Sequence, residues 1–420
     1  MKRVIFHVDV NSAFLSWEAC YRIHHLGGEQ DLREMVSAVG GDQEKRHGII
    51  LAKSIPAKKY HIQTGETVVS AKEKCPDLIL VPPNYDLYNR SSKALLKLLF
   101  EYTDKIEQYS IDEAFLDMTG CCDDPEKTAY EIKDRVRAEL GFTVNIGVSE
   151  NKLLAKMASD FTKPDRVHTL WKSEISEKMW PLPVSDLFYV GHASLNKLRK
   201  LGIHTIGELA TTDPGILQAH MKSHGLLIWQ YANGIDDSKL IDVPLPAKGY
   251  GNSLTTPQDV TEPSIARQYL LSLSETIAAR LRADGVKISV VSISLRDWDL
   301  RFYGHQISLS VPTDLTVEIY HAACQCLSEL WDGIPLRHLG IRTSRVTTDQ
   351  FRQMQLFDTV DYEKAKTMEK TVDRIRKKYG MDSIKRACFL PSAESMEMDH
   401  MAGGISREKR TVDYTREKIL

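Results

Sequence analysis

The sequence predicts a multidomain α+β fold built around a ferredoxin-like sheet. Its 420 residues are enough for roughly two to four domains, each with its own core. Between residues 1 and 170, strand-like and helix-like segments follow the order β-α-β-β-α-β, which is typical of a four-stranded sheet with helices on one face. A proline-containing linker at 241–250 then separates a compact helical region from a second, smaller α/β domain.

The first of these strands is the apolar run Val4–Val8, which ends at Asp9. Apolar residues at helical spacing follow from Ser12 to Leu26, and Gly27-Gly28 predicts the end of that helix. An inserted subdomain is expected over 36–80, with short strands at 36–39 and 48–52 and a closing segment at 77–83. The sheet pattern then resumes with helices at 84–103 and 124–140 and a strand at 142–148.

Two adjacent carboxylates, Asp112 and Glu113, interrupt the strand-forming run Tyr109–Asp117. Neighbouring side chains on a strand point to opposite faces, so the two acids converge only if the chain turns there. We therefore expect a hairpin tip, which the predicted topology places beside Asp9 on the adjacent central strand. Three hard oxygen ligands of this kind suit one or two Mg²⁺ ions and phosphoryl or nucleotidyl transfer. The plain alternative is a solvated turn, because aspartate is common in turns.

Residues 171–235 predict a compact set of helices, and Gly191 and Ala193 lie in the tight turn before one of them, at 194–201. Backbone amides at such a turn can bind a DNA phosphate, as in a helix-hairpin-helix motif. The alternative is that Gly191 is an ordinary loop glycine before a helix, with no role in DNA binding. Beyond the linker we expect strands at 287–297, 301–311 and 338–346, and helices at 264–283, 314–331 and 362–379.

Composition narrows the classes of protein without choosing a partner. The chain is 42% hydrophobic and 27% charged, and it contains no apolar run near the roughly 20 residues that cross a bilayer. No signal peptide is recognisable, so we expect a cytoplasmic protein that does not bind membranes. Seven cysteines without CxxC spacing argue against a disulfide framework or a zinc site. The net charge of −2 requires any DNA-binding surface to be local.

Three motifs in the same order resemble the Y-family translesion DNA polymerases, the group that contains bacterial DNA polymerase IV and the UmuC subunit of polymerase V. They are Asp9-Val10-Asn11-Ser12-Ala13-Phe14, Ser110-Ile111-Asp112-Glu113-Ala114, and the stretch 151–160 leading into Lys163-Pro164. The resemblance covers about residues 1–390 and leaves the DNA polymerase IV and UmuC-like branches open. It implies a palm at 1–25 and 80–170, fingers at 26–79, a thumb at 171–240, a linker at 241–250, a little finger at 251–348 and a C-terminal tail at 349–420.

The resemblance also implies a role for individual residues. Asp9, Asp112 and Glu113, with the Val10 carbonyl, occupy the positions that bind two Mg²⁺ ions, and Lys163 matches a lysine that contacts the dNTP triphosphate. Phe14 stands at the steric gate, where a ring under the sugar excludes a 2′-hydroxyl; a core aromatic is the alternative. The implied partners are primer-template DNA and dNTP, and a need for a RecA-like or UmuD-like protein is left open.

The fingers segment departs from the commoner family pattern. Where a tyrosine and, three residues later, an arginine typically face the nucleotide phosphates, this chain has Ile55 and Lys58. Lys58 keeps a positive charge without the bidentate fork of arginine, and Ile55 has no hydrogen-bond donor in its side chain. We therefore expect Lys58 to be the nucleotide-binding residue and binding to be weaker than in the Ile55→Tyr, Lys58→Arg double variant.

The tail contains Gln353-Met354-Gln355-Leu356-Phe357, which resembles the peptide that binds the bacterial sliding clamp. Gln353, Leu356 and Phe357 would be its anchors, because two large apolar side chains can supply hot-spot energy from little area. The alternative is a strand end packed in a core. From about Pro391 the composition predicts disorder.

Two other functions remain compatible with this sequence. One is a nucleotide cyclase or another two-metal enzyme, because the sheet and the acids alone do not specify a substrate. The other is a non-catalytic or partner-dependent polymerase homologue that binds DNA or the clamp.

Overall fold

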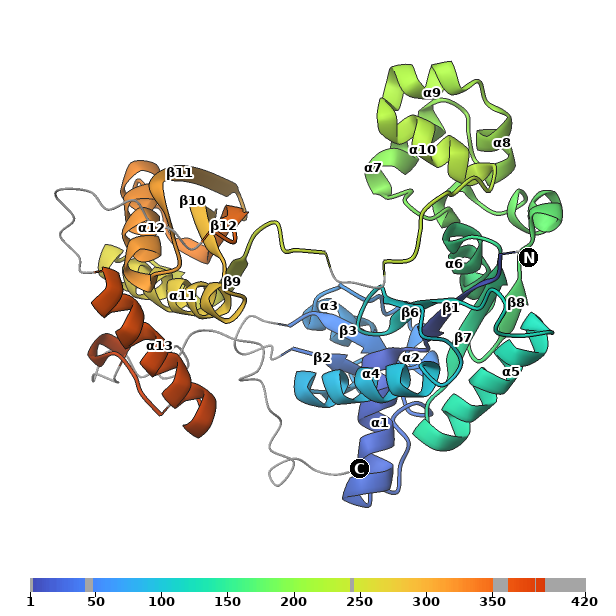
Figure 1. Ribbon diagram of the computed structural model, residues 1–420, viewed down its shortest axis with the longest axis horizontal. Helices are drawn as coiled ribbons and strands as arrows, with labels where there is room; N and C mark the ends of the chain where they lie inside the picture. The colour runs from blue at the N-terminus through green and yellow to red at the C-terminus, as the bar shows by residue number, and fades with distance from the viewer. Residues whose placement is uncertain (1–2, 42–47, 242–244, 350–361, 382, 390–420) are drawn as a thin grey trace. The chain divides into compact units, whose positions relative to one another are not determined.

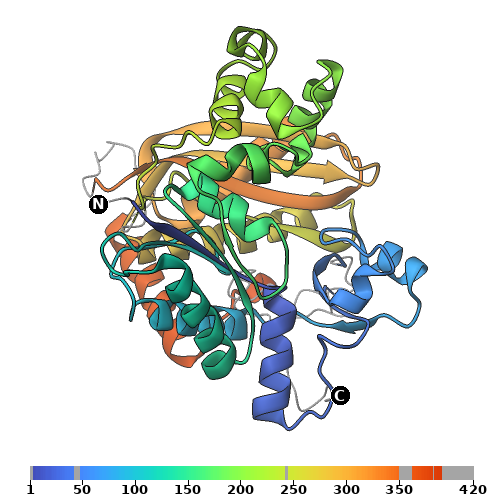
Figure 2. The same cartoon turned by 90° about the vertical axis from the view of Figure 1, so that its right-hand side faces the viewer.

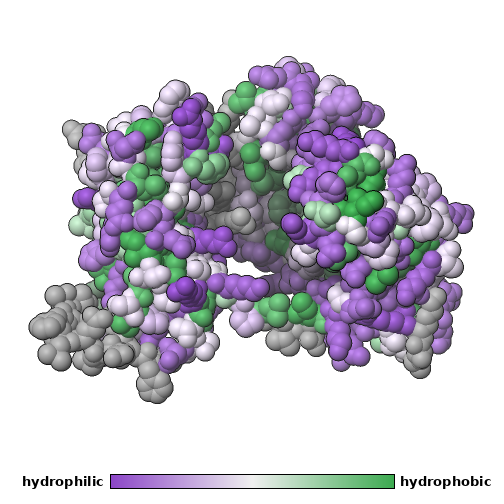
Figure 3. Space-filling view, turned by 90° about the horizontal axis from the view of Figure 1, so that it is seen from above, coloured by the Kyte–Doolittle hydropathy of each residue, from purple (hydrophilic) through white to green (hydrophobic). Residues whose placement is uncertain are grey.

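The computed structural model describes residues 3–41, 48–241, 245–349, 362–381 and 383–389. Contacts divide the chain into two compact units, and the boundary in the linker falls between Leu245 and Pro246. Hydrophilic side chains are the commonest over the face seen in Figure 3, with smaller hydrophobic patches between them. No helix within the described ranges is long and apolar enough to cross a membrane.

The N-terminal unit is organised by a five-stranded sheet (Figure 1). Its strands are β1 (Ile5–Val10), β5 (Ile106–Gln108), β6 (Glu113–Asp117), β7 (Val144–Ser149) and β8 (Val167–Thr169). The order is β5-β6-β1-β7-β8; the first four strands pair antiparallel, and β8 joins β7 in parallel. This is the predicted ferredoxin-like order with one strand added at the edge.

Both faces of this sheet are covered, whereas the sequence suggested helices on one face only. Its helices are α1 (Ala13–Leu26), α4 (Tyr85–Leu99), α5 (Pro125–Arg135, continued by a π turn over Val136–Leu140) and α6 (Lys152–Asp160). Phe6, Val8 and Val10 of β1 join the core formed with α1, α4 and α5. Ile5 packs instead with Ala155 of α6, so α6 lies on the opposite face.

The helix after β1 ends where glycine allows it. Gly27 adopts a left-handed conformation with φ 71°, and the amide of Gly28 donates to the carbonyl of Arg22 at 2.9 Å. These contacts satisfy carbonyls that the last turn of α1 would otherwise leave unpaired. The helix end at Leu26 that Gly27-Gly28 predicted is therefore confirmed.

The insertion forms a small subdomain with its own core around Ile50, Ala57 and Val68. A three-stranded sheet in the order β3-β2-β4 is built from β2 (Ser37–Gly40), β3 (Ile50–Lys53) and β4 (Ile79–Val81), with α2 (Ile55–Lys58) and α3 (Val68–Lys74) beside it.

The next segment is helical, as predicted, and Figure 2 shows its helices gathered at one end of the N-terminal unit. They are α7 (His192–Lys200), α8 (Ile206–Thr211), α9 (Pro214–Met221) and α10 (Ser223–Ala232), preceded by short 3₁₀ or π turns at Lys172–Glu174, Ile175–Met179 and Val184–Asp186. Leu153, Leu154 and Met157 of α6 belong to the same hydrophobic cluster. Helix α6 therefore connects this region to the sheet.

The C-terminal unit is a four-stranded antiparallel sheet in the order β11-β10-β12-β9. Its elements are β9 (Gly251–Val260), α11 (Pro263–Ala283), β10 (Lys287–Asp297), β11 (Phe302–Thr313), α12 (Thr316–Leu330), β12 (Leu336–Thr347), α13 (Tyr362–Tyr379) and a 3₁₀ turn at Ala387–Phe389. Ion pairs from Arg282 of α11 to Glu369 and Asp373 hold α13 against the domain. Strand β9 was not predicted, because its sequence is polar and contains Pro257.

Candidate active site

Strand pairing brings the three sequence-predicted carboxylates to one edge of the sheet. Asp9 lies directly opposite Glu113 in the β1–β6 pairing, and the amide of Val10 donates to the carbonyl of Asp112 at 3.0 Å. The amides of Tyr109 and Ser110 donate to the carbonyl of Glu113, which closes the turn between β5 and β6. Asp112 therefore sits at the tip of a hairpin beside the end of β1.

Two lysines pair with two of these carboxylates, Asp9 and Glu113, whereas Asp112 accepts a hydrogen bond from the hydroxyl of Ser110. Lys163 Nζ lies 2.5 Å from Asp9 Oδ2, and Lys156 Nζ lies 2.5 Å from Glu113 Oε1 and 3.7 Å from Asp9 Oδ2. Asp160 contacts both ammonium groups, at 2.8 Å from Lys163 and 3.4 Å from Lys156. Sequence reasoning named Lys163 but not Lys156 or Asp160. Their i,i+4 spacing in the 151–160 motif was the available signal, since it places both on one face of a helix.

Burial and charge shift the ionisation of this cluster in opposite directions. Burial raises the pKa of Asp9 although Lys163 opposes it, and burial likewise raises the pKa of Glu113 against the hydrogen bond from Lys156. Burial alone would lower the pKa of Lys156, but the charges of Asp160 and Glu113 outweigh it and raise that pKa. The ammonium groups thus provide the positive charge that the buried carboxylates require.

The donor set fits a hard divalent cation once the lysines release it. Asp9, Asp112 and Glu113 offer only carboxylate oxygens, the ligands that Mg²⁺ prefers. As placed, no three acidic, histidine or cysteine side chains in the described part of the chain stand close enough together to hold a metal ion. Occupation by a cation therefore requires the Lys156 and Lys163 ammonium groups to move off the carboxylates.

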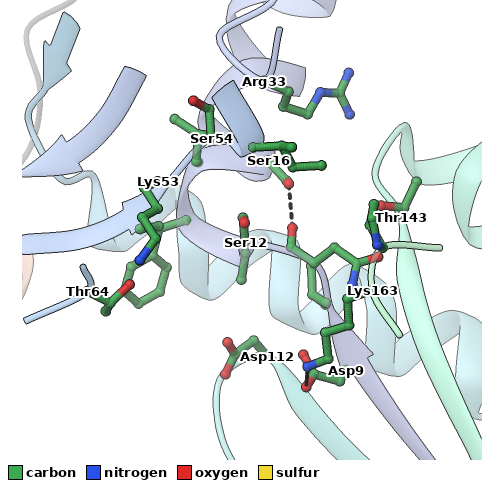
Figure 4. A pocket seen from close by; sticks show the side chains of 18 of the residues that line it. Asp9, Ser12, Ser16, Arg33, Lys53, Ser54, Thr64, Asp112, Thr143 and Lys163 are labelled. Carbon is green, nitrogen blue, oxygen red and sulfur yellow. Dashed lines mark hydrogen bonds and ion pairs between the residues drawn. The ribbon is translucent and has the colours of Figure 1, made fainter. Parts of the chain in front are cut away.

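The acidic edge opens into a cavity of about 700 Å³. Asp9, Asp112, Glu113 and Lys163 line one wall, and Figure 4 shows Asp9, Asp112 and Lys163 gathered there while Lys53 and Thr64 reach in from another side. The inserted subdomain supplies that second wall, which includes Lys53, Ser54, Ile55, Lys58 and Thr64. The sequence-predicted residues Phe14 and Lys58 also line this cavity.

Phe14 rests on a layer of aromatic side chains. Its ring stacks on Tyr88 of α4, with centroids 4.5 Å apart and planes at 10°, and Tyr85 meets it edge-on. Tyr88 is fully buried, whereas Phe14 is partly exposed. The ring of Phe14 therefore packs against the core on one side and lines the cavity on the other, and its role as the steric gate stays a prediction.

The remaining predicted residues lie away from this cavity or outside the described residues. Gly191 is the N-cap of α7 and Ala193 lies in its first turn, and both are exposed. Their contact with DNA stays a prediction. Gln353, Leu356 and Phe357, and the tail after Pro391, fall outside the described residues.

Comparisons with known proteins identify relatives along most of the chain. Residues 8–160 match the model of the impB/mucB/samB family, and residues 247–356 match that of its C-terminal domain. A "DNA polymerase IV" of Clostridium acetobutylicum is 43% identical over 94% of this chain and 100% of its own length. A "DNA polymerase IV" of Acetivibrio thermocellus is 39% identical over 93% and 98%, and "DNA polymerase IV 2" of Bacillus subtilis is 35% identical over 96% and 98%.

A solved structure supports the fold independently. A Y-family DNA polymerase chimera of Dbh and Dpo4 superposes with a TM-score of 0.70, covering 82% of this chain and 100% of the chimera at 20% identity. The family models and the sequence relatives confirm the family expected from the three sequence motifs. With the sequence relatives covered over almost their full length, the chain belongs to the impB/mucB/samB family and is a Y-family DNA polymerase.

Proposed function

We propose that this protein is a template-directed DNA polymerase of low processivity that carries out translesion synthesis. It would transfer a nucleotide from dNTP to the 3′-hydroxyl of a primer. The observation that carries the proposal is the convergence of Asp9, Asp112 and Glu113 on one wall of a cavity whose opposite wall carries lysines. The full-length relatives named DNA polymerase IV support the same activity.

We propose that Asp9, Asp112 and Glu113, with the Val10 carbonyl, hold two Mg²⁺ ions. When bound, such ions lower the pKa of the attacking hydroxyl and stabilise charge on the transferred phosphate. Lys163 then leaves Asp9 and turns to the dNTP triphosphate, while Asp160 remains within its reach. Lys156 would likewise move off Glu113 and keep Asp160, which already lies 3.4 Å from its ammonium group, as its partner.

Phe14 would screen the sugar of the incoming nucleotide. Its ring is partly exposed in the cavity and is fixed from behind by Tyr88. A rigid ring beneath the sugar leaves no room for a 2′-hydroxyl, whereas a deoxyribose fits. Selection against ribonucleotides would therefore come from shape rather than from a hydrogen bond.

The open face of the sheet in the C-terminal unit suits the DNA backbone. Cross-strand neighbours on this face are Ser294 with Gly304 and Gly340, and Ser292 with Gln306 and Arg342. Ile293 and Leu295 of the same strand point into the core instead. These pairs combine small hydroxyl and glycine residues with an arginine and contain no carboxylate. Such a surface favours sequence-independent contacts to phosphates.

We assign this unit the little-finger role, the five-stranded sheet that of the palm, the insertion that of the fingers and the helices α7–α10 that of the thumb.

Primer extension by the purified protein tests the proposal. Mg²⁺ and dNTPs are supplied with an undamaged template and with one containing an abasic site, and an Asp112→Asn, Glu113→Gln variant of unchanged circular dichroism is the control. We expect extension on both templates and none by the variant. Absence of extension, even with the sliding clamp added, would favour the non-catalytic or partner-dependent homologue, and extension that stops at the abasic site would remove the translesion part.

A further inference from the structure

The cavity wall opposite the carboxylates contains two lysines whose side chains make no ion pair within the part of the chain that the structure describes. Lys53 is the last residue of β3, and Lys58 lies at the end of α2. Both line the cavity, as does Lys163. Lys163, however, is occupied by Asp9 and Asp160, so Lys53 and Lys58 are the basic groups already available to an anion in this wall.

A well-ordered turn holds these two lysines close together. Ser54, which separates β3 from α2, is buried, and its hydroxyl accepts hydrogen bonds from the amides of Ala57 at 3.1 Å and Ser37 at 3.2 Å. The backbone that carries Lys53 at the end of the strand and Lys58 at the end of the helix is therefore fixed. Figure 4 shows Lys53 pointing into the cavity beside Thr64.

The electrostatics of this wall favour an anion. Burial, followed by the positive charge of Lys58, lowers the pKa of Lys53. Two neighbouring ammonium groups repel each other, although the charge of Glu66 partly offsets that repulsion at Lys53, and a polyanion placed between the two lysines would relieve the rest and raise the pKa of Lys53 again. Ile55, half exposed on the same wall, has no side-chain donor to offer such a ligand.

We propose that Lys53 binds the polyphosphate of the incoming dNTP together with Lys58. This inference rests on the proposed function and adds a nucleotide-binding residue to it. Lys53 approaches from the inserted subdomain and Lys163 from the acidic wall, so the polyphosphate is held between the two sides of the cavity. A contact between Lys53 and the template backbone is the competing outcome, which the experiment separates.

The test compares Lys53→Met with Lys59→Met in the full chain. Lys59 is an exposed lysine next to Lys58 that does not line the cavity, so it matches the loss of charge without touching the site. Four quantities are measured: the kcat and the KM for dNTP, the inhibition constant of inorganic tripolyphosphate, and the Kd for primer-template DNA without nucleotide.

We expect Lys53→Met to raise the KM for dNTP and the inhibition constant of tripolyphosphate by about tenfold, the loss typical of one charge-assisted hydrogen bond, with DNA affinity unchanged. Lys53→Arg should restore most of both, because it keeps the charge. Unchanged values in Lys53→Met, or a rise confined to the Kd for DNA, would overturn the inference. If the wild-type protein does not extend primers, the proposed function fails, and tripolyphosphate binding by calorimetry still tests Lys53.

Discussion

Replacing Gly147 with alanine should damage both stability and catalysis, because helix α6 lies directly on this strand position. A Cβ at Gly147 would stand 1.9 Å from the carbonyl oxygen of Ala155 and 2.5 Å from the amide nitrogen of Ser159. The helix must therefore retreat by about 1.5 Å before that carbonyl reaches an ordinary contact distance of 3.4 Å. Overpacking of this kind costs about 1–3 kcal/mol.

The same movement reaches the active site. Helix α6 carries Lys156 and leads into Lys163, and both contact the carboxylates on β1 and β6. A displacement of about 1 Å in catalytic geometry can cost on the order of a hundredfold in rate. We therefore expect Gly147→Ala to lower kcat by about that factor while the protein remains folded at the assay temperature.

The assay combines urea unfolding with primer extension at saturating dNTP and DNA. Gly191→Ala is the matched control for stability, because no atom beyond its own chain neighbours lies within 4 Å of the position that its Cβ would take and its φ of −88° suits alanine. A Gly147→Ala protein that unfolds at the same urea concentration as the wild type, with unchanged kcat, would refute the close packing of α6 on β7 and the coupling derived from it.

Three further substitutions test other parts of the structure. Phe14→Ala should lower the ratio of kcat/KM for dNTP to that for rNTP by about tenfold or more, and an unchanged ratio would exclude Phe14 as the steric gate. Glu369→Gln removes one of the two carboxylates that pair with Arg282, while Asp373 remains, so it should destabilise the C-terminal unit by about 2 kcal/mol in urea unfolding, the loss typical of one hydrogen bond to a charged group; a loss below about 0.5 kcal/mol would contradict this contribution. Burial and a hydrogen bond to Asp284 raise the pKa of Tyr250 to about 12 from 10.0, so the stability that its neutral phenol provides is complete below pH 10 and is lost as the pH rises through 12. Tyr250→Phe should flatten that alkaline decline, and equal slopes for the two proteins would count against the shift.

Hydrophobic periodicity predicted those elements that bury a regular face. The range expected for β10 coincides with the observed Lys287–Asp297, and the helix expected at 264–283 differs by one residue from the observed α11 (Pro263–Ala283). Strand β9 escaped prediction because Gly251–Val260 pairs its backbone at a sheet edge while exposing polar side chains, so its sequence lacks the alternation of a half-buried strand. Periodicity therefore detects burial, and it fails where an edge strand is held by hydrogen bonds.

Some residues of the candidate site could be predicted from the sequence and others could not, for a different physical reason. Asp9, Asp112 and Glu113 could be brought together from the sequence because strand order alone determines their proximity. The contacts of Lys156 and Asp160 depend on α6 crossing the opposite face of the sheet. That close packing requires a glycine at position 147, more than a hundred residues from β1. Lys53 is a similar case, because its proposed role is inferred from its position in the folded cavity and from the absence of an ion-pair partner among the described residues, and not from any motif. Residues that act through backbone pairing are thus accessible to sequence reasoning, whereas residues that act through the charge around them become visible only when the packing is known.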